Sequence, residues 1–195
     1  MTNLACARGG RTLFRNLNLD LPAGRCVVVR GPNGSGKSTL LRLAAGLYPD
    51  YEGGIEAADA FYLGQKPGIS GLLSPRENLQ WYRRAGLSAG GAGSPRAKRS
   101  VDEAMAAVGL EACSEIPCAR LSQGQQRRAG LARALLSPLR LWLLDEPLTA
   151  LDAQGRSLVG RFIEDHCAGG GAAMCASHQP LGAMDSAAIE LGGGR

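Results

Sequence analysis

Short apolar runs alternate with segments of helical spacing along most of the chain. The apolar runs predict buried strands at residues 26–29, 139–144 and 172–177. Shorter or alternating patterns predict further strands at residues 4–7, 16–21, 60–63 and 189–191, and helical spacing predicts helices at 37–45, 125–136 and 152–168. Because strands and helices alternate, we expect an α/β fold with a mainly parallel sheet and ligands at the carboxyl ends of its strands.

A stretch in the middle of the chain has no strand pattern. Ser74 and Glu77 form the two halves of a capping box, and Pro75 occupies the first helical position, so a helix is expected to begin there. A glycine- and serine-rich link follows at 88–94, and a second helix is expected at 95–108. These two helices predict a small helical insertion between the two halves of the fold.

Length and composition fit one globular domain. The chain has 195 residues, of which 45% are hydrophobic, and this is enough to bury a core. Its apolar runs are shorter than the ~18 residues of a membrane span, and its first residues lack a signal-peptide pattern, so we expect a cytoplasmic protein. The net charge of +5 comes without an aromatic-interleaved basic stripe, which favours a solvated surface or contact with anionic lipid over nucleic-acid binding.

The cysteines show neither a C-x-x-C pair nor histidine partners at zinc-binding spacing. They are Cys6, Cys26, Cys113, Cys118, Cys167 and Cys175. We expect free thiols in a reducing compartment, several of them in core strands, without a metal or disulfide role.

One glycine-rich segment has the pattern of a phosphate-binding loop. Gly-Pro-Asn-Gly-Ser-Gly-Lys-Ser occupies residues 31–38, between the apolar run 26–29 and a helix. In this context the pattern G-x-x-x-x-G-K-[ST] predicts a P-loop, because its glycines let main-chain N–H groups point at a polyphosphate and the helix N-terminus attracts anions. Lys37 is expected to reach the β- and γ-phosphates, and the Ser38 hydroxyl to bind Mg²⁺. The chain is therefore predicted to bind a nucleoside triphosphate, rather than to carry a glycine turn followed by Lys-Ser by chance.

Two acidic residues stand at the end of the apolar run 139–144. Asp145 is expected to hold Mg²⁺ through water, and Glu146 to act as general base for the attacking water. The alternative is a surface Asp-Glu pair before Pro147. In a chain that already carries a P-loop, the catalytic interpretation is favoured.

A second anion site is predicted at the start of the helix 125–136. Ser122 supplies a hydroxyl, Gly124 exposes its backbone, and the helix N-terminus adds its dipole. On its own this pattern is also that of a capped helix. Because one nucleotide cannot readily use two such sites of one subunit, the pattern points to a site shared between two subunits.

Five motifs follow one another in the order of an ABC transporter ATPase, which the chain resembles over nearly its whole length. They are the P-loop, Leu-Ser-Gln-Gly-Gln at 121–125, Leu-Leu-Asp-Glu-Pro at 143–147, Thr-Ala-Leu-Asp at 149–152 and His178. The resemblance implies a P-loop NTPase fold with antiparallel N-terminal strands, ATP with Mg²⁺, and a head-to-tail homodimer. In that dimer Ser122 and Gly124 bind the γ-phosphate held by the partner's P-loop. The resemblance further implies that Asp152 is the D-loop acid linking the two sites, and that His178 contacts the γ-phosphate and orients water.

Finer motifs resemble the ATP-binding subunits of the cytochrome c biogenesis heme exporters. They are Gly-Arg-Thr-Leu-Phe at 10–14, Pro-Gly-Ile at 67–69, Glu-Asn-Leu at 77–79, Gln-Gln-Arg-Arg at 125–128, Pro-Leu-Thr-Ala-Leu-Asp at 147–152 and His-Gln-Pro-Leu at 178–181. This resemblance implies a peripheral subunit on the cytoplasmic side of the bacterial inner membrane, bound to membrane subunits of the CcmB, CcmC and CcmD type. Its ATP hydrolysis is then coupled to heme export or to release of a heme-loaded chaperone, and heme is handled by the partners.

Three positions depart from these families. Gln123 stands where many ABC proteins have Gly, and Lys66 stands before Pro-Gly where a Gln is usual. Gln65, one position earlier, keeps a suitable spacing to Glu77 and is assigned as the Q-loop residue that senses γ-phosphate and metal. The aromatic residue that stacks on adenine is missing, and Arg8 stands about there, either stacking through its guanidinium plane or solvated.

The predicted site residues are grouped by role. Catalysis is assigned to Lys37, Glu146 and His178, and metal binding to Ser38, Gln65 and Asp145. Phosphate binding is assigned to Gly31, Pro32, Asn33, Gly34, Ser35, Gly36, Lys37, Ser38 and Thr39. The signature motif that acts in trans comprises Leu121, Ser122, Gln123, Gly124 and Gln125. The whole chain is expected to be one ABC nucleotide-binding domain, with a RecA-like core at 1–64 and 137–195 and the Q-loop, helical subdomain and signature helix at 65–136.

Three functions stay compatible with these motifs. The favoured one is the motor of a heme-linked membrane complex, and the second is the motor of another small-molecule exporter, since the membrane partner selects the cargo. A soluble ABC ATPase acting on DNA or ribosomes is the least favoured. Such chains carry two cassettes or a long coiled-coil insertion, and this sequence shows neither pattern. The insertion at 65–108 is the expected docking face, with Trp81, Tyr82, Arg83 and Arg84 as candidates, unless Trp81 or Tyr82 fills the subdomain core.

Overall fold

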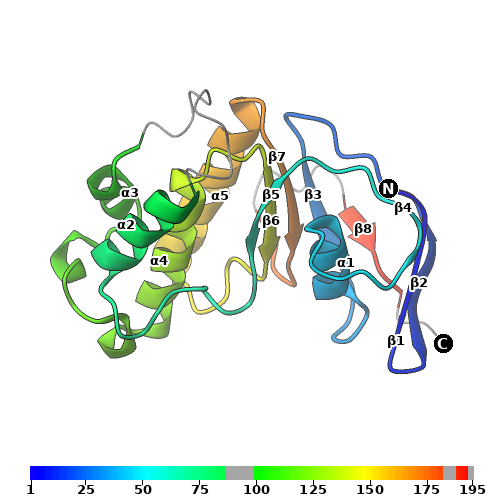
Figure 1. The fold of residues 1–195 in the computed structure, drawn as a ribbon, viewed down its shortest axis with the longest axis horizontal. Helices are drawn as coiled ribbons and strands as arrows, with labels where there is room; N and C mark the ends of the chain where they lie inside the picture. The colour runs from blue at the N-terminus through cyan, green and yellow to red at the C-terminus, as the bar shows by residue number, and fades with distance from the viewer. Residues whose placement is uncertain (87–98, 182–187, 193–195) are drawn as a thin grey trace. The chain divides into compact units, whose positions relative to one another are not determined.

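Figure 1 shows the fold in a computed structural model, which describes residues 1–86, 99–181 and 188–192. The chain divides into two compact units. The first unit contains Met1–Tyr62, Arg140–Glu146 and Ile163–Arg195, and the second contains Leu63–Leu139 and Pro147–Phe162. The functional division into a RecA-like core and a helical subdomain stays a prediction.

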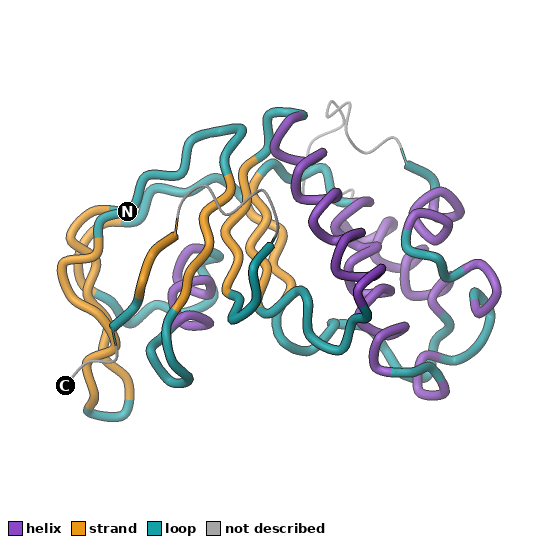
Figure 2. The backbone as a smooth tube through the Cα atoms, turned by 180° about the vertical axis from the view of Figure 1, so that it is seen from behind, coloured by secondary structure: helices purple, strands orange, loops and turns teal. Residues whose placement is uncertain are grey.

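A five-stranded sheet carries the P-loop and the acidic pair. Figure 2 draws the strands of the chain in orange. Across it lie β5 (Ala60–Leu63), β6 (Leu141–Asp145), β7 (Ala172–Ala176), β3 (Cys26–Arg30) and β8 (Ala188–Glu190), in that order. β6 pairs with β7, and β3 pairs with both β7 and β8, each time in parallel. Asp145 and Val29 are both in register with Ala176, so the carboxyl ends of three strands meet at one edge of the sheet. That edge is where ligands bind in α/β sheets.

The N-terminal strands form a separate antiparallel sheet in the order β2-β1-β4. Its strands are β1 (Thr2–Arg8), β2 (Arg11–Leu17) and β4 (Glu52–Gly54). The strand predicted at 16–21 is wrong, because the hairpin at Gly9 and Gly10, both with positive φ, pairs Arg8 with Arg11 and starts β2 there. β4 was not among the predicted strands, and its pairing with β1 imposes the extended conformation.

The helices are α1 (Lys37–Ala44), α2 (Pro75–Gly86), α3 (Val101–Ala107), α4 (Gln123–Leu136) and α5 (Ala153–Ala168), with short 3-10 turns η1 (Glu111–Cys113) and η2 (Cys118–Arg120). The other predicted strands and the helices α1, α4 and α5 are confirmed to within two residues. Within residues 1–86, 99–181 and 188–192, none of the helices has both the length and the apolar composition that crossing a membrane requires.

Capping boxes set where α2 and α3 begin. The predicted box of α2 is confirmed, because the Ser74 hydroxyl accepts from the Glu77 N–H at 3.2 Å and the Glu77 carboxylate accepts from the Ser74 N–H at 2.8 Å. The helix expected from Pro95 begins at Val101 instead, since Ser100 and Glu103 make a second capping box. Pro95 and the link at 88–94 lie outside the described residues.

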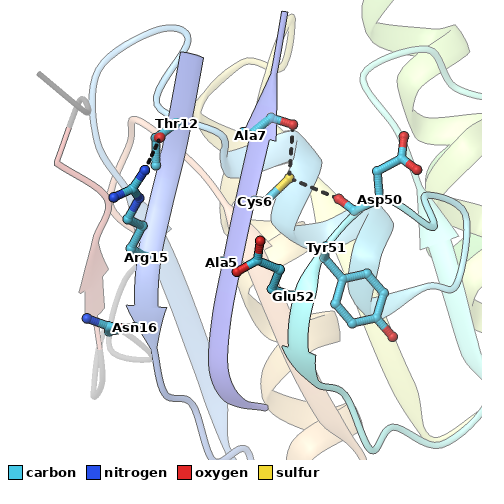
Figure 3. Close-up of a pocket in the computed structure, with 9 residues that line it drawn as sticks. All are labelled: Ala5, Cys6, Ala7, Thr12, Arg15, Asn16, Asp50, Tyr51 and Glu52. Carbon is cyan, nitrogen blue, oxygen red and sulfur yellow. Dashed lines mark hydrogen bonds between the residues drawn. The ribbon is translucent and has the colours of Figure 1, made fainter. Parts of the chain in front are cut away.

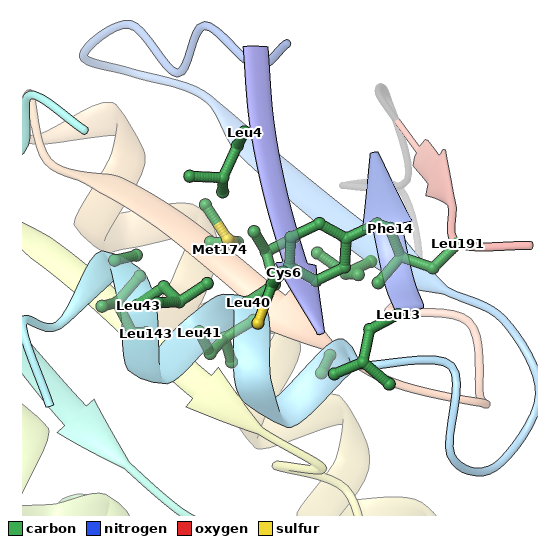
Figure 4. Close-up of a cluster of buried hydrophobic side chains, with 13 residues drawn as sticks. Leu4, Cys6, Leu13, Phe14, Leu40, Leu41, Leu43, Leu143, Met174 and Leu191 are labelled. Atoms are coloured by element: carbon green, nitrogen blue, oxygen red, sulfur yellow. The ribbon is translucent and has the colours of Figure 1, made fainter. Parts of the chain in front are cut away.

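Buried side chains of the first unit form one hydrophobic core (Figure 4). This cluster contains Leu4, Cys6, Leu13, Phe14, Val29, Leu40, Leu41, Leu43, Ala44, Leu143, Met174, Ala176 and Leu191. A Cβ atom on Gly36 would lie 3.0 Å from the Cβ of Leu13 and 3.2 Å from the Phe14 ring. The P-loop therefore rests directly on β2 at Gly36, where the absence of a side chain permits this close approach.

Candidate active site

The P-loop joins β3 to α1 through backbone conformations that favour glycine. Gly31, Gly34 and Gly36 have φ values of 137°, 80° and 102°. A side chain at Gly31 would overlap the carbonyl oxygen of Leu191, which follows β8. The N-cap Gly36 has no side chain to cap α1, so no N-cap side chain takes up the first N–H groups of this helix. Backbone N–H groups at a helix N-terminus suit a phosphate.

Lys37 is buried and holds the P-loop in shape. Its Nζ donates to the carbonyl oxygen of Gly31 at 2.8 Å and to that of Pro32 at 3.0 Å. An ammonium group has three N–H donors, so Lys37 has the capacity to bind these carbonyls and a phosphate oxygen together. This arrangement fits the phosphate-binding role predicted for it.

Ser38 and Asp145 form the second part of the site. The Ser38 hydroxyl donates to Oδ1 of Asp145 at 3.0 Å. Asp145, at the end of β6, is only 1% exposed. A hydroxyl and a carboxylate side by side are oxygen ligands of the kind that Mg²⁺ prefers, so these two residues fit the metal predicted here.

Glu146 and His178 lie beside this pair at the same edge of the sheet. The Nε2 atom of His178 is 3.4 Å from Oε1 of Glu146. Glu146 has a φ of 50°, in the left-handed region, and its N–H donates to the carbonyl oxygen of Ala176 at 2.8 Å. A non-glycine residue in this region costs on the order of 1 kcal/mol or more, and such strain persists where the surrounding structure holds it. The first unit thus brings Lys37, Ser38, Asp145, Glu146 and His178 to one edge of the sheet.

The signature motif begins α4 in the second unit. Ser122 is the N-cap: its hydroxyl accepts from the Gln125 N–H at 3.2 Å, and Oε1 of Gln125 accepts from the Ser122 N–H at 2.9 Å. Leu121 is buried, whereas Ser122 and Gln123 are exposed. A Cβ atom on Gly124 would lie 2.8 Å from the carbonyl oxygen of Ala150, so glycine is also required here by packing within the chain.

The predicted Q-loop and D-loop residues also lie in the second unit. The carbonyl oxygen of Gln65, an exposed residue, accepts from a guanidinium N–H of Arg127 at 3.1 Å. The carboxylate of Asp152 accepts from the Gly155 N–H at 2.8 Å in the first turn of α5. Both residues are anchored within their own unit, and their roles toward a nucleotide stay predictions.

Comparisons with known proteins agree with this geometry. The family described as "ABC transporter" matches residues 14–149, which include the P-loop, the signature motif and the acidic pair. The chain belongs to the ABC transporter family. It is an ATP-hydrolysing, ATP-binding member of that family.

Several relatives of this ABC protein share the name "Cytochrome c biogenesis ATP-binding export protein CcmA". The protein of Nitrobacter hamburgensis is 41% identical, with 97% of this chain and 96% of the relative covered. The protein of Methylococcus capsulatus is 41% identical, with 91% and 89% covered, and that of Yersinia pestis is 40% identical, with 93% and 86% covered. A solved structure described as "Structure of ATP binding subunit of ABC transporter" superposes with a TM-score of 0.81 over 97% of this chain and 84% of that chain, at 20% identity. That likeness confirms the predicted fold.

Arg8, the residue proposed for adenine stacking, lies at the exposed end of β1. Its guanidinium carbon is 5.9 Å from the centre of the Tyr48 ring, a cation–π arrangement. Tyr48 follows α1 and was not singled out from the sequence, because a lone tyrosine after a helix carries no pattern. Whether the Arg8–Tyr48 pair meets adenine stays a prediction.

A cavity of about 580 Å³ opens on the N-terminal sheet of this ABC protein (Figure 3). Its lining comes from β1, β2, β4 and the residues before β4: Ala5, Cys6, Ala7, Thr12, Arg15, Asn16, Asp50, Tyr51 and Glu52. The Cys6 thiol points to the Asp50 carbonyl oxygen at 3.5 Å, and burial raises the pKa of this thiol. None of these lining residues belongs to the predicted site, so the cavity is separate from the P-loop.

Proposed function

We propose that this chain is the ATP-hydrolysing subunit of a transporter complex for cytochrome c biogenesis. It couples ATP hydrolysis to heme export or to release of a heme-loaded chaperone, on the cytoplasmic side of the bacterial inner membrane. The observation that carries the proposal is the match to the CcmA protein of Nitrobacter hamburgensis, which is 41% identical over nearly the full length of both chains. The arrangement of the P-loop, Asp145, Glu146 and His178 supports the hydrolytic part.

The proposed mechanism assigns one task to each side chain. The P-loop amides and Lys37 bind the β- and γ-phosphates, while Ser38 and Asp145, together with Gln65, would hold Mg²⁺, whose charge offsets that of the phosphates. Glu146 accepts a proton from the attacking water, whose oxygen bonds to the γ-phosphorus as the bond to the bridging oxygen breaks, leaving ADP and phosphate. His178, at 3.4 Å from Glu146, orients this water and contacts the γ-phosphate.

A homodimer completes each site in this proposal. Ser122 and Gly124 of one copy face the γ-phosphate bound by the P-loop of the other copy, in a head-to-tail arrangement. Ser122, the exposed N-cap of α4, carries a hydroxyl, and the helix dipole is positive at this end. The N-terminus of α4 is therefore suitable for an anion. Closure of the dimer on ATP and its opening after hydrolysis would change the conformation of the membrane subunits bound to it.

The proposed docking face for the CcmB-type membrane subunit lies around the start of α2. Leu72 is 89% exposed and Trp81 is 67% exposed, so Trp81 does not fill the core of its unit. Tyr82 is half-buried with the Arg133 guanidinium carbon 4.7 Å from its ring centre, and burial raises its pKa. A cavity of about 180 Å³ is lined by Trp81, Tyr82 and Arg133 among others. Arg83 and Arg84, which follow Tyr82 in the chain, are exposed. Exposed apolar side chains around a small cavity suit a membrane subunit that inserts a side chain there.

A substitution of the proposed base tests the function. The variant Glu146→Gln should bind ATP like the parent and lose hydrolysis by about 10²- to 10⁴-fold, since the general base is gone. It should accumulate as an ATP-bound dimer, measured by size-exclusion chromatography with and without ATP. In a bacterium that depends on this chain, Glu146→Gln should fail to restore mature c-type cytochromes, and the parent should co-purify with CcmB-type subunits. Hydrolysis at the parental rate by Glu146→Gln would contradict the assignment of Glu146 as general base. Co-purification of the parent with the membrane subunits of a different exporter would contradict the role in heme export.

A further inference from the structure

Helix α4 binds the backbone of the Q-loop segment, defined as residues 64–68, along one of its faces. Arg127 donates to the carbonyl oxygens of Gly64 at 2.8 Å and Gln65 at 3.1 Å. One turn later a Cβ atom on Gly130 would lie 2.8 Å from the carbonyl oxygen of Pro67, so helix and segment are in close contact. A further turn along, Arg133 donates to the carbonyl oxygens of Pro67 and Gly68, each at 2.9 Å.

Arg127 also contacts the segment that follows Glu146. Its Nε donates to the carbonyl oxygen of Pro147 at 3.5 Å, and Pro147 directly follows Glu146 in the chain. Arg127 is only 4% exposed, which is unusual for a charged side chain. A guanidinium is a planar group with several N–H donors in fixed directions, so one side chain reaches all three carbonyls.

The backbone at Glu146 needs such support. Its φ of 50° lies in the left-handed region, where a non-glycine residue persists only if neighbouring contacts hold it. On the N-terminal side the Glu146 N–H is bound by the Ala176 carbonyl oxygen at 2.8 Å. On the C-terminal side the carbonyl oxygen of the following residue, Pro147, accepts from Arg127.

We infer that Arg127 is a positioning residue for ATP hydrolysis, which sets the backbone at Gln65 and directly after Glu146. It also ties both to the helix that carries the signature motif. The inference rests on the proposed function, because it assumes that Gln65 and Glu146 act in hydrolysis. Arg127 acts through these two residues and is bound to main-chain carbonyls, so it is not itself a catalytic residue.

The test compares Arg127→Gln and Arg127→Lys with the matched control Arg128→Gln. Arg128 is the next residue of α4, but it donates to the carbonyl oxygen of Val108 at 3.3 Å, at the end of α3. We expect Arg127→Gln to leave the Kd for ATP within about twofold, because the P-loop is untouched, and to lower kcat on the order of ten- to a hundredfold, since small misplacements of catalytic groups have effects of this size. Lysine keeps the charge but loses the planar fork, so Arg127→Lys should restore kcat only in part. Arg128→Gln should keep the parental kcat.

Hydrogen exchange gives a readout that does not depend on catalysis. Amides of a peptide covering residues 60–72 should exchange faster in Arg127→Gln than in the parent, and at the parental rate in Arg128→Gln. Equal losses of kcat in the Arg127→Gln and Arg128→Gln variants would overturn the inference, as would parental kcat and parental exchange in Arg127→Gln. If Arg127→Gln does not fold, the Arg127→Lys variant decides by the same criteria. Failure of the proposed function would instead appear as parental hydrolysis in Glu146→Gln, with the exchange result unaffected.

Discussion

The Ser38 hydroxyl donates a hydrogen bond of 3.0 Å to the carboxylate of Asp145, although 107 positions separate the two residues in the chain. Ser38 is the last residue of the P-loop and lies in the first turn of α1, and Asp145 ends β6. The parallel register of β3, β7 and β6 brings them together, because it aligns the ends of these strands. Two motifs that are far apart in the sequence thus become one set of oxygen ligands next to the phosphate-binding loop.

Loss of the Ser38 hydroxyl should weaken the use of Mg²⁺. We expect Ser38→Ala to need about tenfold more Mg²⁺ for half-maximal hydrolysis, or more, since one oxygen ligand is removed and Asp145 loses a donor. The measurement is a Mg²⁺ titration of ATPase activity at saturating ATP. Ser38→Thr retains a hydroxyl and serves as the control, with a Mg²⁺ requirement near that of the parent. An unchanged Mg²⁺ requirement in Ser38→Ala would contradict the metal assignment.

A packing prediction concerns Gly171 at the start of β7. His166 of α5 stacks on Trp142 with ring centres 3.8 Å apart, and its Nε2 lies 2.9 Å from the Arg140 carbonyl oxygen. A Cβ atom on Gly171 would overlap the His166 ring, so Gly171→Ala should lower the free energy of unfolding by about 1–3 kcal/mol. Thermal unfolding followed by circular dichroism measures the change.

Gly54→Ala is the matched control for this substitution. A Cβ atom there meets nothing within 4 Å, and the φ is not positive, so its effect should stay within about 0.5 kcal/mol. Adding His166→Ala to Gly171→Ala should give less than the sum of the single effects, because the overlap is then relieved. Additive effects would show that the His166 ring is not the cause.

The docking face around α2 should be separable from ATP hydrolysis. Leu72→Ser and Trp81→Ala remove exposed apolar side chains, so we expect reduced co-purification with the membrane subunit and unchanged basal ATPase activity of the isolated chain. Ile116→Ser, which removes another exposed apolar side chain, 41% exposed, in the same unit, should leave co-purification as in the parent. Equal binding of all three variants would place the docking face elsewhere.

Local patterns were enough to predict the P-loop, the acidic pair and most strands and helices. The P-loop is read from a strand, a glycine-rich loop and a helix that are contiguous, and the strand of Asp145 from a single apolar run. β4 was missed because Glu-Gly-Gly has no apolar alternation, and only pairing with β1 makes it extended. The strand at 16–21 was misplaced because alternation continues past Leu17, whereas the hairpin decides the pairing.

Contacts between side chains and main-chain carbonyl oxygens could not be predicted from the sequence. Arg127 looks like half of a solvent-exposed Arg pair, and its burial depends on carbonyls contributed by residues 64, 65 and 147. One signal was available: Arg127 lies four positions before Leu131 on the buried stripe of α4. Similarly, Gly124 was assigned to phosphate binding alone, whereas the carbonyl of Ala150 also excludes a side chain there.

This second role of Gly124 determines how the signature motif is best tested. Gly124→Ala would disturb packing within the chain as well as any contact in trans, and Ser122→Ala would remove the N-cap of α4 at a cost of about 1 kcal/mol. Aspartate is as good an N-cap as serine, and a negative charge at a helix N-terminus is favourable. Ser122→Asp should therefore keep the stability of α4.

In a dimer, the same aspartate would face the γ-phosphate bound by the partner copy. Like charges in such a contact repel, so Ser122→Asp in the Glu146→Gln background should bind ATP with the parental Kd and no longer form the ATP-dependent dimer. Size-exclusion chromatography with ATP and Mg²⁺ measures the dimer, and thermal unfolding of the nucleotide-free chain checks that α4 is intact. Ser122→Asn, which also caps the helix but carries no charge, should retain part of the dimer. A full ATP-dependent dimer of the Ser122→Asp variant would mean that the signature motif does not contact phosphate, and that Ser122 serves only to begin α4.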